Sequence, residues 1–189
     1  KKGSVAIRKY DMTAAQAAGD YSEDMYVATG EKDTVAEQKL ADYAMEGVQF
    51  SCLRVGNIET HSVQKGTETS VELIYEIPEK LADILKLMKE NAVDMSKQGE
   101  AYPCHNTGVL HYTGQQISDA LEAILKADEV AAKNALEHYL YDYGTLDATT
   151  DQKEASGVCN LPKTDKNGYT HLDNLELGLY LFVETEVPE

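Results

Sequence analysis

Lys9 is the first residue whose place in the sequence suggests chemistry. It follows Val5 and Ile7 at intervals of two, so the three side chains share one face of an expected strand over residues 4–10. At a sheet edge such a lysine extends its ammonium group into solvent, and the pattern alone favours this ordinary arrangement. If the amine is buried instead, desolvation favours its neutral form, which is a nucleophile.

Glu184 places a carboxylate in line with aromatic rings. It alternates with Tyr180 and Phe182 in an expected strand over residues 179–185. A carboxylate there either reaches water at the end of a sheet or is buried with a partner. Beside a neutral Lys9, a protonated Glu184 could act as a general acid and proton carrier. We therefore predict that Lys9 and Glu184 face the same interior and pair as ions.

The cysteines are weaker candidates. The three cannot all pair within one chain, and either Cys52 or Cys104 could form a disulfide with Cys159 in a secreted protein. Cys52 also fits the ordinary role of a small buried hydrophobic residue. A thioester between Cys104 and Gln115 or Gln116 is disfavoured, because the spacing and neighbours do not match those of Cys–Gln thioester domains.

The histidines and the known catalytic motifs give no strong site. The five histidines lack any i, i+4 ligand pair: His61, His105, His111, His138 and His171. His105 and His111 lie near Cys104, but no second cysteine or carboxylate motif accompanies them, so we expect no metal and no cofactor. The sequence has no nucleophile elbow and no phosphate-binding glycine pattern, and we expect no enzyme.

Composition narrows the possible partners. The chain has 189 residues and a formal net charge of −16 at pH 7. This charge argues against binding to nucleic acids or to anionic membrane surfaces, because both need cationic patches. No apolar segment approaches the roughly 20 residues of a membrane-spanning helix.

The hydrophobic patterns predict strands at both ends of the chain and helices between them. Strands are expected over residues 4–10, 48–55, 71–77, 169–172 and 179–185. Helices are expected over residues 35–44, 79–90, 114–126 and 129–142, and loops or turns over residues 12–34, 61–66, 92–112 and 145–168. This order indicates a mainly β, α+β fold. We expect a single domain over residues 1–189, an antiparallel sandwich with a mainly helical insertion at about residues 78–145.

Four segments together resemble one family of surface proteins. They are GSVAIRKYD at residues 3–11, EGVQFS at residues 46–51, TDKNG at residues 164–168, and GLYLFVET at residues 178–185, which is followed by Pro188. The last resembles the E-box of Gram-positive, sortase-assembled pilins and of related Cna-B-type modules. The others are similar to the first strand, the second strand and the E-box lead-in of that family.

The resemblance implies a Cna-B-like (immunoglobulin-like) sandwich that forms the N-terminal domain of a backbone pilin. In that family the E-box glutamate assists an internal lysine–asparagine isopeptide bond. This role would fall to Glu184, with Lys9 as the lysine and an acceptor asparagine beyond residue 189.

The resemblance also implies a structural subunit of a covalently polymerised pilus shaft. Its partners would be neighbouring pilin subunits, joined by sortase through a lysine outside this chain. Its location would be extracellular, on a pilus anchored to the cell wall. The alternative is an ancillary pilin or surface adhesin whose helical insertion binds a host ligand.

Overall fold

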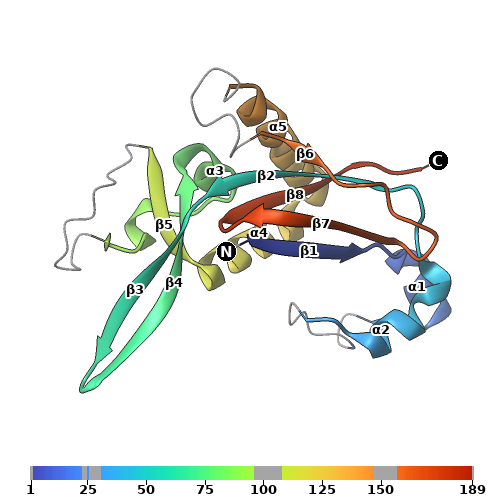
Figure 1. Ribbon diagram of the computed structural model, residues 1–189, viewed down its shortest axis with the longest axis horizontal. Coiled ribbons are helices and arrows are strands. Elements are labelled where there is room, and N and C mark those ends of the chain that lie inside the picture. The colour runs from blue at the N-terminus through green and yellow to red at the C-terminus, as the bar shows by residue number, and fades with distance from the viewer. Residues whose placement is uncertain (1, 23–24, 26–30, 96–107, 147–156, 189) are drawn as a thin grey trace. The chain divides into compact units, whose positions relative to one another are not determined.

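The chain has an α+β fold in which strands and helices alternate in blocks (Figure 1). A computed structural model describes residues 2–22, 25, 31–95, 108–146 and 157–188. The strands are β1 (Lys2–Arg8), β2 (Gln49–Gly56), β3 (Ile58–Lys65), β4 (Glu68–Pro78), β5 (Val109–Thr113), β6 (Cys159–Asn160), β7 (Tyr169–Glu176) and β8 (Leu179–Glu186). The helices are α1 (Met12–Ala18), α2 (Thr34–Lys39), α3 (Glu79–Ile84), α4 (Gly114–Ala127) and α5 (Glu129–Leu146), with short 3-10 helices η2 (Ala41–Tyr43) and η3 (Lys89–Asn91).

The strands form three small sheets, and the residues group into two compact units. The sheet orders are β1-β7, β6-β2-β8 and β3-β4-β5, the last antiparallel throughout. The first unit comprises Cys52–Cys159 and Glu176–Val183, and the second comprises Lys2–Ser51, Asn160–Leu175 and Glu184–Glu189. None of the helices in the described part of the chain is long and apolar enough to cross a membrane.

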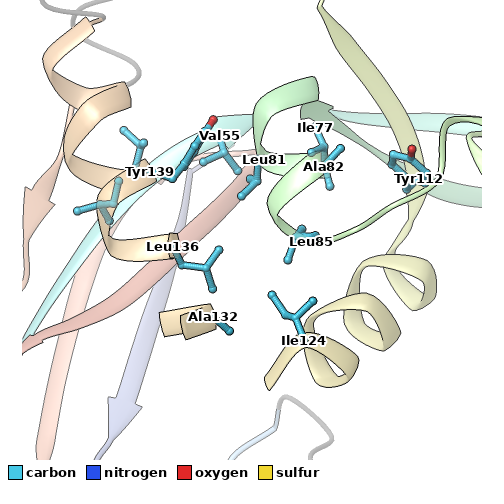
Figure 2. Packing of buried hydrophobic residues seen from close by; sticks show 12 residues of the cluster. Val55, Ile77, Leu81, Ala82, Leu85, Tyr112, Ile124, Ala132, Leu136 and Tyr139 are labelled. Carbon is cyan, nitrogen blue, oxygen red and sulfur yellow. The ribbon is translucent and has the colours of Figure 1, made fainter. Parts of the chain in front are cut away.

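The core of the first unit joins the helices to the sheet. Figure 2 shows apolar side chains from α3, α4 and α5 converging with side chains of β2, β4 and β5. The buried members are Leu53, Val55, Ile77, Leu81, Ala82, Leu85, Tyr112, Ile124, Ala132, Leu136, Tyr139 and Leu140. The helices expected over residues 79–90, 114–126 and 129–142 therefore do bury apolar side chains against neighbouring elements.

The helix starts follow the capping chemistry of the sequence. Thr113 Oγ1 accepts a hydrogen bond from the Gln116 amide at 3.2 Å, and Gln116 Oε1 accepts one from the Thr113 amide at 2.9 Å. This capping box satisfies two amides at the start of α4. In the second unit, Asp33 caps α2 by accepting bonds from the amides of Val35 at 3.0 Å and Ala36 at 2.9 Å.

Segments that were predicted to be loops or turns contain regular structure. Residues 12–34 were expected to be a loop, but Asp11 caps helix α1 and Gly19 ends it with φ of 81°. Residues 61–66 were expected to be a turn, but β3 continues to Lys65, and the reversal uses only Gly66 and Thr67 before β4 begins (Figure 1). Pairing between β3 and β4 in this hairpin extends both strands beyond their apolar alternation.

The region predicted as the helical insertion differs in detail. The helix expected over residues 79–90 ends at Ile84, and two residues later Lys86 adopts a left-handed φ of 56°. Residues 92–112 were expected to be irregular, yet Val109–Thr113 form β5, which pairs with β4 from Ile74 to Pro78. The segment is short, and its partner lies far away in the sequence, so local pattern gave little sign of it.

Candidate functional site

The structure brings Lys9 and Glu184 into direct contact. Lys9 Nζ lies 2.7 Å from Glu184 Oε2, and the two side chains are 31% and 28% exposed. The Lys9 backbone is fixed on both sides: its amide donates to Gly168 O at 2.8 Å, and its carbonyl accepts from the Met45 amide at 3.0 Å. Lys9 lies one residue beyond β1, so a rigid backbone frame holds the base of a long, flexible side chain.

A tight turn supplies one side of this frame. Asp165 Oδ1 accepts hydrogen bonds from the amides of Asn167 at 2.8 Å and Tyr169 at 3.0 Å, and the Gly168 amide donates to Asp165 O at 2.8 Å. Gly168 has φ of 70°, and a Cβ atom there would overlap the Lys9 carbonyl oxygen. Glycine is therefore required both for the left-handed conformation and for the close approach to Lys9.

A buried threonine connects this turn to the segment before β2. Thr164 is 3% exposed, and its hydroxyl donates to Met45 O at 2.7 Å while accepting from the Val48 amide at 2.9 Å. Its carbonyl also accepts from the Gly47 amide at 2.8 Å. Thr164 and Asp165, which belong to the TDKNG segment at residues 164–168, thus hold the backbone around Lys9 in place. The only sign of this role in the sequence was that threonine and aspartate side chains often hydrogen-bond to nearby backbone groups.

The residue after Glu184 is tied to a small polar network. Ser51 is 1% exposed and donates to Asn160 Oδ1 at 2.6 Å, while its Oγ lies 3.1 Å from Thr185 Oγ1. Thr185 Oγ1 also donates a hydrogen bond to Gln49 O at 3.5 Å. This network positions the end of β8 that carries Glu184, and the sequence analysis did not identify Ser51.

The chemistry that this pair can perform is proton exchange between an ammonium and a carboxylate. The 2.7 Å distance allows a direct charge-assisted hydrogen bond. About three-tenths of each side chain still contacts solvent, so water screens the pair and its contribution to stability is small, about 1 kcal/mol or less. A neutral lysine amine at this position would need further burial of the pair.

The two described cysteines lie together as thiols. Cys52 on β2 is buried, Cys159 on β6 is exposed, and no disulfide joins them. Burial, and secondarily the neighbouring Cys159 thiol, raises the pKa of Cys52 to about 11. Of the two disulfides considered from the sequence, the structure thus places the Cys52–Cys159 partners side by side, whereas Cys104 lies outside the described residues.

The thioester candidate gains nothing from the described residues. Gln116 is engaged in the α4 capping box, and Gln115 Nε2 donates to Asp119 Oδ1 at 2.7 Å. Cys104 and the neighbouring His105 lie outside the described residues.

One histidine has surroundings that the sequence analysis missed. His111 on β5 is the direct register partner of Glu76 on β4, and Glu59 on β3 approaches the same imidazole. These residues are far apart in the sequence, so no spacing motif links them. The available signal was Glu76 itself, a charged residue in the apolar run between Ile74 and Ile77.

Comparison with protein-family models, with curated proteins and with solved structures finds no match to this chain. The sequence motifs and the geometry around Lys9 and Glu184 are therefore the grounds on which a function is proposed.

Proposed function

We propose that this chain is the N-terminal domain of a sortase-assembled backbone pilin, a structural subunit of a covalent pilus shaft. Its fold would be a Cna-B-like, immunoglobulin-like sandwich, and its location the wall-anchored pilus outside the cell. The observation that carries the proposal is the 2.7 Å contact between Lys9 Nζ and Glu184 Oε2. The lysine of the first strand motif and the glutamate of the E-box-like motif meet although 174 residues separate them in the chain.

In the proposed reaction Lys9 forms an amide bond with an asparagine that follows Glu189. A proton first passes from the ammonium group to the Glu184 carboxylate, which leaves a neutral amine. The amine nitrogen attacks the asparagine side-chain carbon, and the former amide nitrogen leaves as ammonia after Glu184 returns a proton to it. The products are one isopeptide bond and one ammonia, with Glu184 regenerated. The strand that carries the asparagine would also cover the pair and exclude the water that now reaches it.

Intact-mass measurement tests this reaction. Residues 1–189 should have their full calculated mass, whereas the protein extended through the next strand should lack the mass of one ammonia. Lys9→Arg and Glu184→Gln in the extended protein should each restore the full mass, because one lacks a neutral amine and the other lacks the proton carrier.

The chain provides a matched control pair for this experiment. Lys163 Nζ lies 2.6 Å from Glu186 Oε1, but these side chains are 50% and 59% exposed. Lys163→Arg and Glu186→Gln should leave the ammonia loss unchanged. An extended protein of full mass, or an ammonia loss that survives Lys9→Arg, would contradict the proposal. The adhesin alternative would instead be favoured by specific binding on arrays of host glycans or matrix proteins.

A further inference from the structure

Two glutamates and a histidine converge on one face of the sheet formed by β3, β4 and β5. His111 Nε2 lies 3.5 Å from Glu59 Oε2 and 3.8 Å from Glu76 Oε1. One potential ligand atom from each residue lies within 4.8 Å of those from the other two. The exposed fractions of the side chains are only 15% for His111, 16% for Glu59 and 5% for Glu76. The cluster is therefore largely removed from solvent, unlike an ordinary group of surface acids.

The strands hold these side chains in a fixed frame. Glu76 and His111 are register partners on β4 and β5, and Glu59 pairs with Ile74, two residues from Glu76 on the same face. The Glu76 amide also donates to Asn57 O at 2.9 Å. Since adjacent strands are hydrogen-bonded along their length, the three side chains project from a preorganised base.

Glu76 has an oxygen with no partner. Its Oε1 is buried and makes no hydrogen bond with any residue that the structure describes, and 3.8 Å to His111 Nε2 is too long for one. An ionised carboxylate without a partner in such surroundings is very unfavourable. The oxygen lies 3.8 Å from His111 Nε2, so a cation placed among the three residues would satisfy it.

We propose that Glu59, Glu76 and His111 bind a divalent transition-metal ion, for which Zn²⁺ is the probe. Ligand atoms bound at about 2.1 Å in a tetrahedron lie about 3.4 Å apart. The observed separations of 3.5 Å and 3.8 Å are close to this value and need only small side-chain movements. A dication with two carboxylates and a neutral imidazole also gives a site without net charge, which suits its burial.

The donor set determines the kind of ion. Imidazole nitrogen is a good ligand for Zn²⁺ and its neighbours, whereas Ca²⁺ and Mg²⁺ prefer sites made wholly of oxygen. Three protein ligands leave at least one position on Zn²⁺ for water. We therefore expect binding of Zn²⁺ and Co²⁺, and much weaker binding of Ca²⁺ and Mg²⁺.

Calorimetric titration of the whole chain with Zn²⁺ should show one site per molecule. Glu76→Gln, Glu59→Gln and His111→Ala should each weaken binding by about 100-fold or more, since even outer-shell changes cost roughly 10- to 100-fold. Two matched controls test for adventitious binding. His171→Ala removes an exposed histidine whose Nε2 lies 3.5 Å from Asp173 Oδ2, and Glu72→Gln removes the same charge from an exposed position on β4. Both controls should bind Zn²⁺ as the unaltered chain does.

Two spectroscopic measurements use the unaltered chain, so they do not depend on whether the variants fold. Titration with Co²⁺ should give visible absorption of a four- or five-coordinate site without thiolate charge-transfer bands, and Zn²⁺ should shift the ¹⁵N resonances of the His111 ring to values typical of metal ligation. The proposal is overturned if thiolate bands appear, if Zn²⁺ leaves the ¹⁵N resonances of the His111 ring unchanged, or if His171→Ala rather than His111→Ala abolishes binding.

Discussion

Replacing Gly168 by alanine tests the idea that the turn before β7 holds Lys9 in place. Gly168 has φ of 70°, and an added methyl group would overlap the Lys9 carbonyl oxygen and lie 3.3 Å from the Met45 nitrogen. Relief of this overlap requires the turn and the Lys9 backbone to move apart. The movement would break two hydrogen bonds: Lys9 N to Gly168 O at 2.8 Å and Met45 N to Lys9 O at 3.0 Å.

The expected cost follows from these two effects. A left-handed conformation costs a non-glycine residue about 1–2 kcal/mol. Each lost backbone hydrogen bond adds about 1 kcal/mol. Gly168→Ala should therefore lower the free energy of unfolding by about 3–4 kcal/mol, to be measured by urea denaturation followed by circular dichroism.

Gly19→Ala is the control for the conformational part alone. Gly19 belongs to the same compact unit and has φ of 81°, but an added methyl group would meet nothing within 4 Å. This variant should lose only about 1–2 kcal/mol. Amide hydrogen exchange at Lys9 and Met45 should accelerate in Gly168→Ala and not in Gly19→Ala. Equal destabilisation by the two variants would show that the close approach of Gly168 to Lys9 contributes nothing.

Two further predictions concern the first unit. Burial raises the pKa of Cys52 from 9.0 to about 11, so the folded state holds the thiol proton more tightly than the unfolded state does. The stability that this proton contributes is complete below pH 9 and is lost as pH rises toward 11, so the free energy of unfolding measured by urea denaturation should decline less across this range in Cys52→Ala. Iodoacetamide at pH 8 should alkylate Cys159 faster than Cys52. Leu140→Ala, at a fully buried position on α5, should cost about 2–5 kcal/mol in the same denaturation assay, whereas Val130→Ala, at a 71% exposed position on that helix, should change stability by less than about 0.5 kcal/mol.

The sequence predicted those elements whose signals are local. The helices α4 and α5 followed from their hydrophobic patterns, and β8 followed from its apolar and aromatic run. The strands β3 and β5 were missed or shortened because their residues are mixed in character. β3 pairs with β4 in a hairpin across Gly66 and Thr67, whereas the pairing of β5 with β4 joins segments that are far apart in the sequence and that no local window contains.

The same distinction applies to the sites. Alternation selected Lys9 and Glu184 as a pair, and their side chains do contact each other, but it indicated neither how much solvent would still reach them nor that Lys9 would lie beyond the end of β1. Ser51 and Thr164 are ordinary hydroxyl residues in the sequence, and only their burial shows that they position the chain around the pair. The partners of His111 depend on the register between strands, and the sequence alone did not show which strands pair or in which register.

The two proposed sites lie in different compact units and depend on different physical conditions. Lys9 and Glu184 belong to the second compact unit, whereas Glu59, Glu76 and His111 belong to the first. The crosslink depends on a proton moving between two partly exposed side chains and on a strand that would cover them. The metal site depends on a buried carboxylate that lacks a partner and on a rigid sheet. A pilus shaft under tension would gain from the covalent bond directly, because breaking it requires chemistry rather than unfolding. Bound metal would act differently, by stabilising the sheet that carries it through mass action. The mass and titration experiments therefore test independent physical claims, and a negative result for one leaves the evidence for the other unchanged.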